Sequence, residues 1–333
     1  MNITEKGTIK IVDYLRGGTE KDFYGEAEVT SVNCPLCEAG QYKLIFKERG
    51  TLGVVRCLSC GLLYANPRLK DPEKIYWGDA DKYFEEAKLI FEGRACHHRD
   101  PNYKQDLKLI RKYKPSGNFL DIGANMGFFL RNAKGRSWNL YGVEPSVPLS
   151  EMARKYFDLN IKTAYLEEAG FQGSFFDIVS MTDVFEHLVN PKEILKEIHR
   201  ILKPDGILFI KVPNGLFNLF KLYCAKASGC LRNYDIFDSY EHIAHYSQQT
   251  LSAMLKGSGF KPVKFFIGKP IQIPVWHNYV GHYYQYPTPW LLDFKRQSAR
   301  RIFYLLSLIE YRLKLNKIGY FAPNIIVISK KAF

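Results

Sequence analysis

The stretch "FLDIGANMGFFL", residues 119–130, joins an apolar run to an aspartate and to two glycines that are four residues apart. A buried strand that turns into a helix has this pattern, because glycine is favoured where φ is positive or where two backbones come close. Such a turn is also where a helix N-terminus and a carboxylate can hold a nucleotide-like ligand. On this stretch alone, plain architecture and ligand binding both remain open.

The sequence around this turn alternates strand-like and helix-like segments from residue 118 onward. Seven strand candidates can be read: "NFLDIG", "NLYGVEP", "IKTAYL", "DIVSMTDV", "GILFIKVP", "KPVKFFIG" and "NIIVISKK". This βαβα alternation predicts an α/β fold with a parallel sheet covered by helices on both faces. Two stretches, 213–246 and 268–322, interrupt the alternation, and we interpret them as inserts.

Composition places the chain among ordinary globular proteins. Of 333 residues, 46% are hydrophobic and 24% are charged, and the length allows two domains. No apolar run approaches about 18 residues and no signal peptide is evident, so we expect a cytoplasmic protein. The net charge of +13 would suit nucleic acid, an anionic membrane or a phosphorylated substrate. Scattered Lys and Arg on helix faces are, however, usually just solvated.

Four of the seven cysteines form two C-x-x-C pairs, Cys34/Cys37 and Cys57/Cys60. The interval between the pairs contains the strand-like segments "YKLIF" and "LGVVRC", as in a zinc ribbon. Four thiolates leave no open coordination position, so we predict a structural zinc ion. The expected organisation is an N-terminal segment with a zinc ribbon at 1–70, a helical connector at 71–117 and the α/β domain at 118–333.

Carboxylates lie at the ends of the predicted strands. The glycine turn lacks the G-x-G-x-x-G spacing of dinucleotide-binding proteins. Glu144 nevertheless ends the next strand, 23 residues after Asp121, where a carboxylate can accept hydrogen bonds from two ribose hydroxyls. A third motif, "MTDVFEHLVNP", follows the fourth strand. In an open α/β sheet, this edge carries the ligand crevice.

Taken together, these motifs resemble those of class I S-adenosylmethionine (SAM)-dependent methyltransferases. The matching residues are Asp121-Ile122-Gly123 through Gly127, Glu144-Pro145, "DVFEHLVNP" and "LKPDGILFIKVPN". The resemblance implies a Rossmann-like, seven-stranded and mostly parallel sheet, and SAM as cofactor. It also implies that the cofactor is held by Asp121, Gly123, Asn125, Gly127, Glu144 and Asp183. The family usually has a glycine where this chain has Asn125, which leaves one close backbone approach in question.

A second resemblance concerns the acceptor. With its cysteine pairs, the chain is similar to bacterial sugar and nucleotide-sugar C-methyltransferases that carry an N-terminal zinc module. The segment "SYEHIAHYS", residues 239–247, matches a motif that lies over their active site. This implies His242 as the first candidate base and Glu241 as a residue that orients an imidazole. His187, directly after the cofactor-lining strand, is the second candidate base.

The departures from that family leave the methylated atom open. Ser239 stands where the family has tyrosine, and only a short segment separates the last two strands in place of a large extra domain. O-methylation and C-methylation of a small-molecule or glycan acceptor are therefore both expected alternatives. A ribosomal or transfer RNA methyltransferase and a non-catalytic zinc-ribbon binding protein are the rival interpretations.

The segment 295–320 combines basic residues with an apolar stripe at helical spacing: Ile302, Leu305, Leu306, Ile309 and Leu313. One interpretation is a helix that packs this stripe on the domain's own core. The other is an interfacial helix that brings the protein to an anionic membrane at the inner membrane face.

Overall fold

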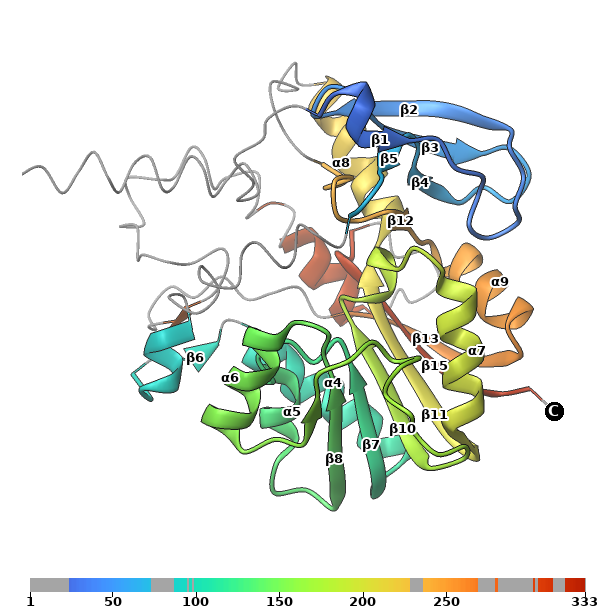
Figure 1. Cartoon of the computed structure of the whole chain (residues 1–333). Coiled ribbons are helices and arrows are strands. Elements are labelled where there is room, and N and C mark those ends of the chain that lie inside the picture. The colour runs from blue at the N-terminus through green and yellow to red at the C-terminus, as the bar shows by residue number, and fades with distance from the viewer. Residues whose placement is uncertain are drawn as a thin grey trace, which may run out of the picture.

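The computed structural model describes residues 24–72, 87–94, 96–97, 99–227, 236–268, 279–280, 302, 305–313 and 321–332 (Figure 1). Most of the predicted basic segment 295–320 and part of the second insert lie outside these residues. Within the described part of the chain, no helix is long and apolar enough to cross a membrane.

A seven-stranded sheet forms the centre of the molecule, with the order β13-β15-β11-β10-β7-β8-β9. Five neighbouring strands run parallel: β9 (Ile161–Lys162), β8 (Trp138–Val143), β7 (Gly117–Ile122), β10 (Phe176–Thr182) and β11 (Leu202–Pro213). The last strand, β15 (Asn324–Lys331), is antiparallel to both β11 and β13 (Phe260–Ile267). The predicted mostly parallel, seven-stranded α/β fold is therefore confirmed.

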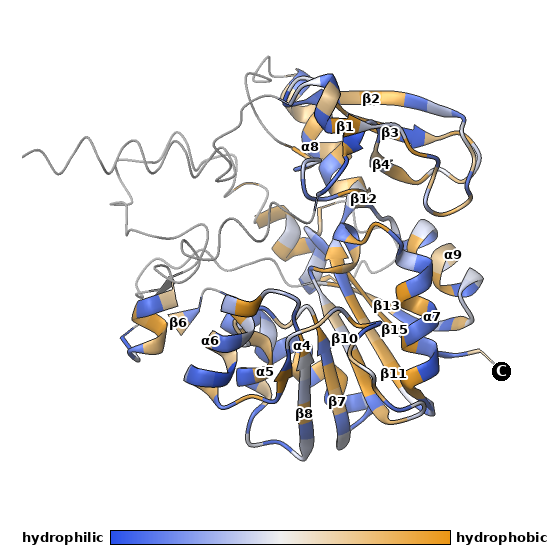
Figure 2. Ribbon diagram, in the orientation of Figure 1, coloured by the Kyte–Doolittle hydropathy of each residue, from blue (hydrophilic) through white to orange (hydrophobic). Residues whose placement is uncertain are grey.

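Helices cover both faces of this sheet because its central strands are apolar on both sides. Phe119 packs in a cluster with α4 (Asp100–Tyr113), α5 (Phe128–Ala133) and α6 (Val147–Phe157). The next residue, Leu120, packs in the opposite cluster with α7 (Pro191–Ile201) and α9 (Gln248–Gly257). This alternation follows from the two-residue period of a strand. Figure 2 shows β10 and β11 as mostly hydrophobic ribbons between the two helix layers.

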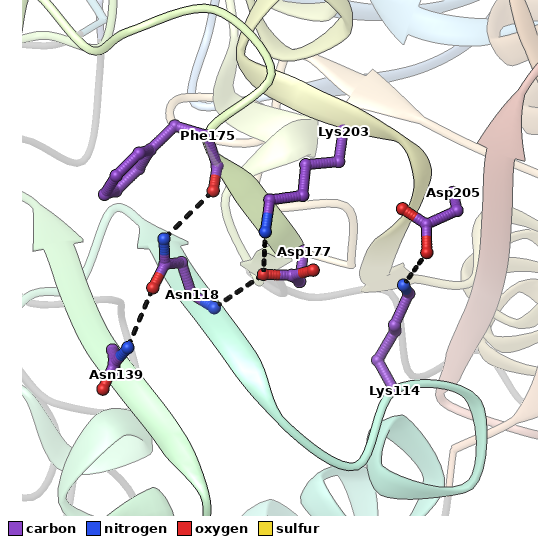
Figure 3. A network of polar contacts seen from close by, with 7 residues as sticks. All are labelled: Lys114, Asn118, Asn139, Phe175, Asp177, Lys203 and Asp205. Carbon is purple, nitrogen blue, oxygen red and sulfur yellow. Dashed lines mark hydrogen bonds and ion pairs between the residues drawn. The ribbon is translucent and has the colours of Figure 1, made fainter.

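A polar network fixes the sheet at the amino ends of its strands (Figure 3). The backbone N–H of Asn118 donates to Asp177 at 2.9 Å, and Lys203 Nζ donates to the same carboxylate at 2.8 Å. The side chain of Asn118 donates to the carbonyl of Phe175, and its oxygen accepts from Asn139. The polar contacts at this edge join neighbouring strands, and the opposite, carboxyl edge carries the candidate site.

The cysteine pairs belong to a second, antiparallel sheet with the order β12-β4-β3-β2. Three of its strands come from the N-terminal region: β2 (Tyr42–Glu48), β3 (Leu52–Cys57) and β4 (Leu63–Ala65). The fourth, β12 (Ala244–His245), comes from the first insert and pairs Ala244 with Tyr64 and His245 with Leu63. The cysteine module is thus joined to the insert that contains the predicted acceptor-site motif.

Besides helical residues at 87–91 and 305–312, the described structure contains several further elements. They are η1 (Glu26–Glu28), β1 (Val29–Thr30), β5 (Arg68–Leu69), β6 (Cys96–His97), η2 (Phe185–His187), α8 (Gly215–Ala227) and β14 (Tyr279–Val280). Strand β1 pairs with β5, and β6 pairs with β14 from the second insert.

Candidate active site at the carboxyl edge of the sheet

The glycine turn after β7 is shaped by the packing of the protein itself. Gly123 and Gly127 have φ of +68° and +79°. A Cβ on Gly123 would lie 2.6 Å from Val184 Cγ2, and one on Gly127 would lie 2.5 Å from Leu159 Cδ1. Both positions therefore require glycine on architectural grounds. Asn125, between them, also has positive φ (+49°), which asparagine tolerates better than most residues.

Glu144, which follows β8, holds this turn in place. One of its carboxylate oxygens accepts the N–H of Asn125 and the other accepts the N–H of Ser146, both at 2.9 Å. The side chain is largely buried, and this burial raises its pKa. Each carboxylate oxygen has about two acceptor sites, so capacity for ligand hydroxyls remains. Glu144 thus connects the glycine turn to the start of α6.

Asp121 lies at the end of β7, next to β10. Its Oδ1 accepts a hydrogen bond from Ser180 Oγ at 2.6 Å, and the residue is only 3% exposed. Burial raises the pKa of Asp121 to about 7, the Ser180 hydrogen bond lowers it, and the charge of Glu144 raises it further. Two carboxyl groups are therefore held close together at adjacent strand ends, as a polar, cationic ligand would require.

Asp183 follows β10 with φ of +57° and forms an ion pair with Arg99, just before α4. Sequence reasoning predicted Asp183 as a cofactor-lining residue but did not identify Arg99. The pair places a cation from the connector over the same strand ends. No local pattern around Arg99 signals this contact, because the two residues are 84 positions apart.

The predicted catalytic residues come together from two separate segments. His187 is at the end of η2 and His242 is in the first insert, yet their ring centroids are 4.6 Å apart. His187 Nδ1 lies 2.9 Å from the backbone oxygen of Glu241. Since a carbonyl can only accept, this contact assigns the proton to Nδ1 and a lone pair to Nε2. The side-chain oxygen of Glu241 lies 3.3 Å from Tyr240 Oη.

Burial keeps these imidazoles uncharged at neutral pH. It lowers the pKa of His242 to about 4, although the charge of Asp183 acts in the opposite direction. The pKa of His187 is held well below its usual value by burial and by the nearby His242. Neutral imidazoles can accept a proton or serve as ligands.

The four predicted metal-binding cysteines also come together. Their sulfur atoms all lie within 4.8 Å of one another, with 3.5 Å between Cys34 and Cys60 and between Cys37 and Cys57. A tetrahedral ion with Zn–S bonds of about 2.3 Å needs sulfur separations of roughly 3.8 Å. The donor set and spacing fit such an ion. Cys34 and Cys57 pack in the same apolar cluster as Tyr246 of the insert.

Comparison with known proteins identifies the class. A family model described as a methyltransferase domain matches residues 96–264, which is about half of the chain. The chain therefore belongs to this methyltransferase family and is a SAM-dependent methyltransferase.

The relatives with a named activity include both an O-methyltransferase and a C-methyltransferase of ubiquinone biosynthesis. An uncharacterized protein of Methanocaldococcus jannaschii is 26% identical over 190 residues, 57% of this chain and 80% of that protein. The ubiquinone/menaquinone biosynthesis C-methyltransferase UbiE of Burkholderia mallei is 26% identical over 174 residues, 46% of this chain and 71% of that protein. A ubiquinone biosynthesis O-methyltransferase of Histophilus somni is 22% identical over 173 residues, 47% of this chain and 73% of that protein.

Among solved structures, a SAM-dependent methyltransferase from Archaeoglobus fulgidus aligns with a TM-score of 0.47 and 19% sequence identity. The alignment covers 75% of this chain and 99% of that one.

Proposed function

We propose that the enzyme methylates a sugar, either nucleotide-linked or part of a cell-surface glycan, on an oxygen or carbon atom. The observation that supports this most is the meeting of His187 with the insert residue His242 beside the strand ends, with ring centroids 4.6 Å apart. An acceptor hydroxyl or acidic C–H must lose a proton, and an imidazole placed beside the donor site suits that step. The sequence resemblance of "SYEHIAHYS" to sugar methyltransferases supports the acceptor class.

SAM, when bound, supplies an electrophilic methyl group on a sulfonium sulfur. In this proposal Asp121 holds the cationic part of SAM and Glu144 holds its ribose. The turn that contains Gly123, Asn125 and Gly127 positions these parts of the cofactor. Asp183 lines the same site from the β10 end. The chain then contributes chiefly alignment of donor and acceptor, which can supply much of the rate gain in a displacement reaction.

His242 is the first candidate base, with its pKa lowered by burial so that it is unprotonated at neutral pH. His187 is the second. The Glu241 backbone oxygen, 2.9 Å from His187 Nδ1, orients that ring. In this proposal Glu241 orients an imidazole, as the sequence resemblance implied, through its main-chain oxygen.

We also propose that Cys34, Cys37, Cys57 and Cys60 bind a structural zinc ion. The ion would stabilise the sheet to which β12 belongs, and β12 lies only two residues after His242. A stable cysteine module would then hold the acceptor-site insert over the methyltransferase domain.

Methyl transfer from radiolabelled SAM to a panel of nucleotide sugars, with RNA tested in parallel, decides the acceptor class. We expect labelled sugar and no labelled RNA. His242→Asn should retain SAM binding and lose roughly 100-fold or more in turnover. His199→Ala, a histidine on α7 that contacts Phe260, is the matched control and should leave turnover unchanged. Labelled RNA together with unreactive sugars would overturn the proposal.

A further inference from the structure

Glu186 is a buried carboxylate whose oxygens have no hydrogen-bond partner among the described residues. The residue is 1% exposed, and both Oε1 and Oε2 are buried. The nearest basic nitrogen of an ion-pair partner is His187 Nε2, 3.7 Å from Oε1. Burying a carboxylate without partners costs several kcal/mol or more. Such a carboxyl group is therefore either protonated, or charged and compensated by a nearby cation.

Helix capping does not explain this carboxylate. Glu186 lies inside the short helix η2, whose N-cap residue is Val184, and no side chain caps that helix. The arginine nearby, Arg99, is engaged by Asp183, so the charges of these two residues largely cancel. Within the described structure, His187 is the ion-pair partner of Glu186. Burial and the charges of Asp183 and Glu241 raise the pKa of Glu186, while the charge of Arg99 lowers it.

Each histidine brings one ring nitrogen close to the Glu186 carboxylate. The contact of His187 Nδ1 with the Glu241 oxygen leaves the lone pair on Nε2. A backbone carbonyl on the other ring nitrogen is the usual outer-shell arrangement of a metal-binding histidine. His242 Nδ1 is buried and lacks a hydrogen-bond partner within the described structure. One ligand atom each from Glu186, His187 and His242 lies within 4.8 Å of the others.

We propose that Glu186, His187 and His242 bind a divalent transition-metal ion, separate from the cysteine quartet. Two imidazoles and one carboxylate are a ligand set that suits Zn²⁺ and related first-row ions and leaves coordination positions open. One cation would compensate the Glu186 carboxylate and the unpaired His242 nitrogen together. This inference rests on the acceptor class of the proposed function: an oxygen of the acceptor would take an open position, and His242 would then serve as a metal ligand instead of as the base proposed above.

The test measures metal content and cobalt spectra on the full-length protein. Purified protein is dialysed against Co²⁺, and bound metal is counted for the wild type, Glu186→Gln, His242→Ala and the control His199→Ala. We expect Glu186→Gln and His242→Ala each to bind one equivalent of Co²⁺ fewer than the wild type. The control His199→Ala should bind as much Co²⁺ as the wild type. The difference between the cobalt spectra of the wild type and of each variant should show d–d absorption bands. It should lack the thiolate charge-transfer bands of cysteine ligation.

Thermal unfolding shows whether a variant loses metal because it is unfolded. Glu186→Gln removes a buried, unpaired carboxylate, so the metal-free variant should be at least as stable as the metal-free wild type. Added Zn²⁺ should raise the Tm of the wild type by more than that of Glu186→Gln, because binding stabilises only a protein that has the site.

Equal metal content in the wild type and in His242→Ala would overturn the metal site, whatever the cysteine quartet binds. These measurements involve neither SAM nor an acceptor, so their outcome tests the metal site separately from the proposed function. Metal binding at this site with no methylation of any sugar would leave the metal site standing and refute the acceptor assignment.

Discussion

Glu48 accepts a hydrogen bond from the backbone N–H of Ser239 at 2.9 Å, across 191 positions of sequence. Its other carboxylate oxygen accepts the N–H groups of Ile236 and Phe237 at 2.9 and 2.8 Å. Glu48 is the last residue of β2 in the cysteine module, and its three donors directly precede Glu241 and His242. One buried carboxylate thus fixes the backbone that delivers the candidate base.

Glu48→Gln should release this segment, because an amide nitrogen would replace one acceptor and face a backbone N–H. The loss of charge-assisted hydrogen bonds is expected to cost about 1–3 kcal/mol of unfolding free energy. Hydrogen exchange at Ile236, Phe237 and Ser239 should accelerate, while the amides of Gly123 and Ala124 should keep their protection. Glu38→Gln, an exposed glutamate of the same module, is the control. Unchanged exchange at all three amides would show that Glu48 does not hold the insert.

Asp121→Asn should stabilise the cofactor-free protein at high pH. The folded-state pKa of Asp121 is raised from 3.8 to about 7, so the folded protein keeps this proton up to about pH 7 whereas the unfolded chain loses it near pH 4. The contribution of Asp121 to stability therefore falls as pH rises toward 7 and then levels off. Between pH 5 and pH 8, the advantage of the asparagine variant should grow by roughly 2–3 kcal/mol. Denaturant unfolding of the wild type and of Asp121→Asn at pH 5 and at pH 8 measures this advantage. The same difference in unfolding free energy at both pH values would contradict the raised pKa.

The sequence allowed the sheet and the carboxylates at its edge to be predicted, because these depend on local patterns. Apolar strands of period two, glycines at positive φ and strand-end acids such as Asp121 and Glu144 are all visible within a few residues. The joining of β12 to the cysteine module was not predictable, because a two-residue strand has no pattern of its own and its partner lies about 180 positions earlier. Glu48 and Arg99 were missed for the same reason, since their contacts with Ser239 and Asp183 join segments that are far apart in the sequence.

Glu144→Ala should weaken SAM binding by at least about tenfold, because it removes a ribose acceptor and also releases the N–H groups of Asn125 and Ser146. Calorimetry with SAM measures the loss. Glu151→Ala, an exposed residue on the following helix, should bind SAM like the wild type. Unchanged affinity in Glu144→Ala would mean that β8 does not contribute to the cofactor site.

Cys57→Ser should lower the metal content of the chain by one equivalent and destabilise the cysteine module. A structural zinc ion supplies much of the folding free energy of a small module, so the loss should appear as early unfolding of β2–β4. Cys96→Ser, at an exposed cysteine outside the quartet, serves as the control. A quartet that is metal-free after anaerobic purification of the wild type would refute the zinc assignment.

The helix that includes residues 305–312 presents its apolar residues to solvent. Ile302, Leu305, Ile309 and Leu313 are each 53–63% exposed, while Ser307 and Glu310 on the same segment are buried. Glu310 accepts the backbone N–H of Phe321 at 2.7 Å, and Ser307 donates to the Phe321 oxygen. Among the described residues, four of the five stripe residues are therefore exposed, whereas the fifth, Leu306, is half-buried.

We propose the second interpretation of the sequence, in which the stripe inserts into an anionic membrane surface and the neighbouring basic side chains contact the lipid headgroups. The full-length protein should sediment with vesicles of phosphatidylglycerol at low salt, and binding should weaken as salt screens the charges. Changing Arg300, Arg301 and Arg312 to Glu should abolish sedimentation, because each basic residue near the surface contributes about 1 kcal/mol. Changing the exposed Lys196 and the half-buried Lys192 on α7 to Glu tests whether total charge alone explains the result. Sedimentation that survives the arginine changes but disappears with the lysine changes would place the lipid contact on α7. No sedimentation of the wild type at low salt would exclude the membrane as the partner of this stripe.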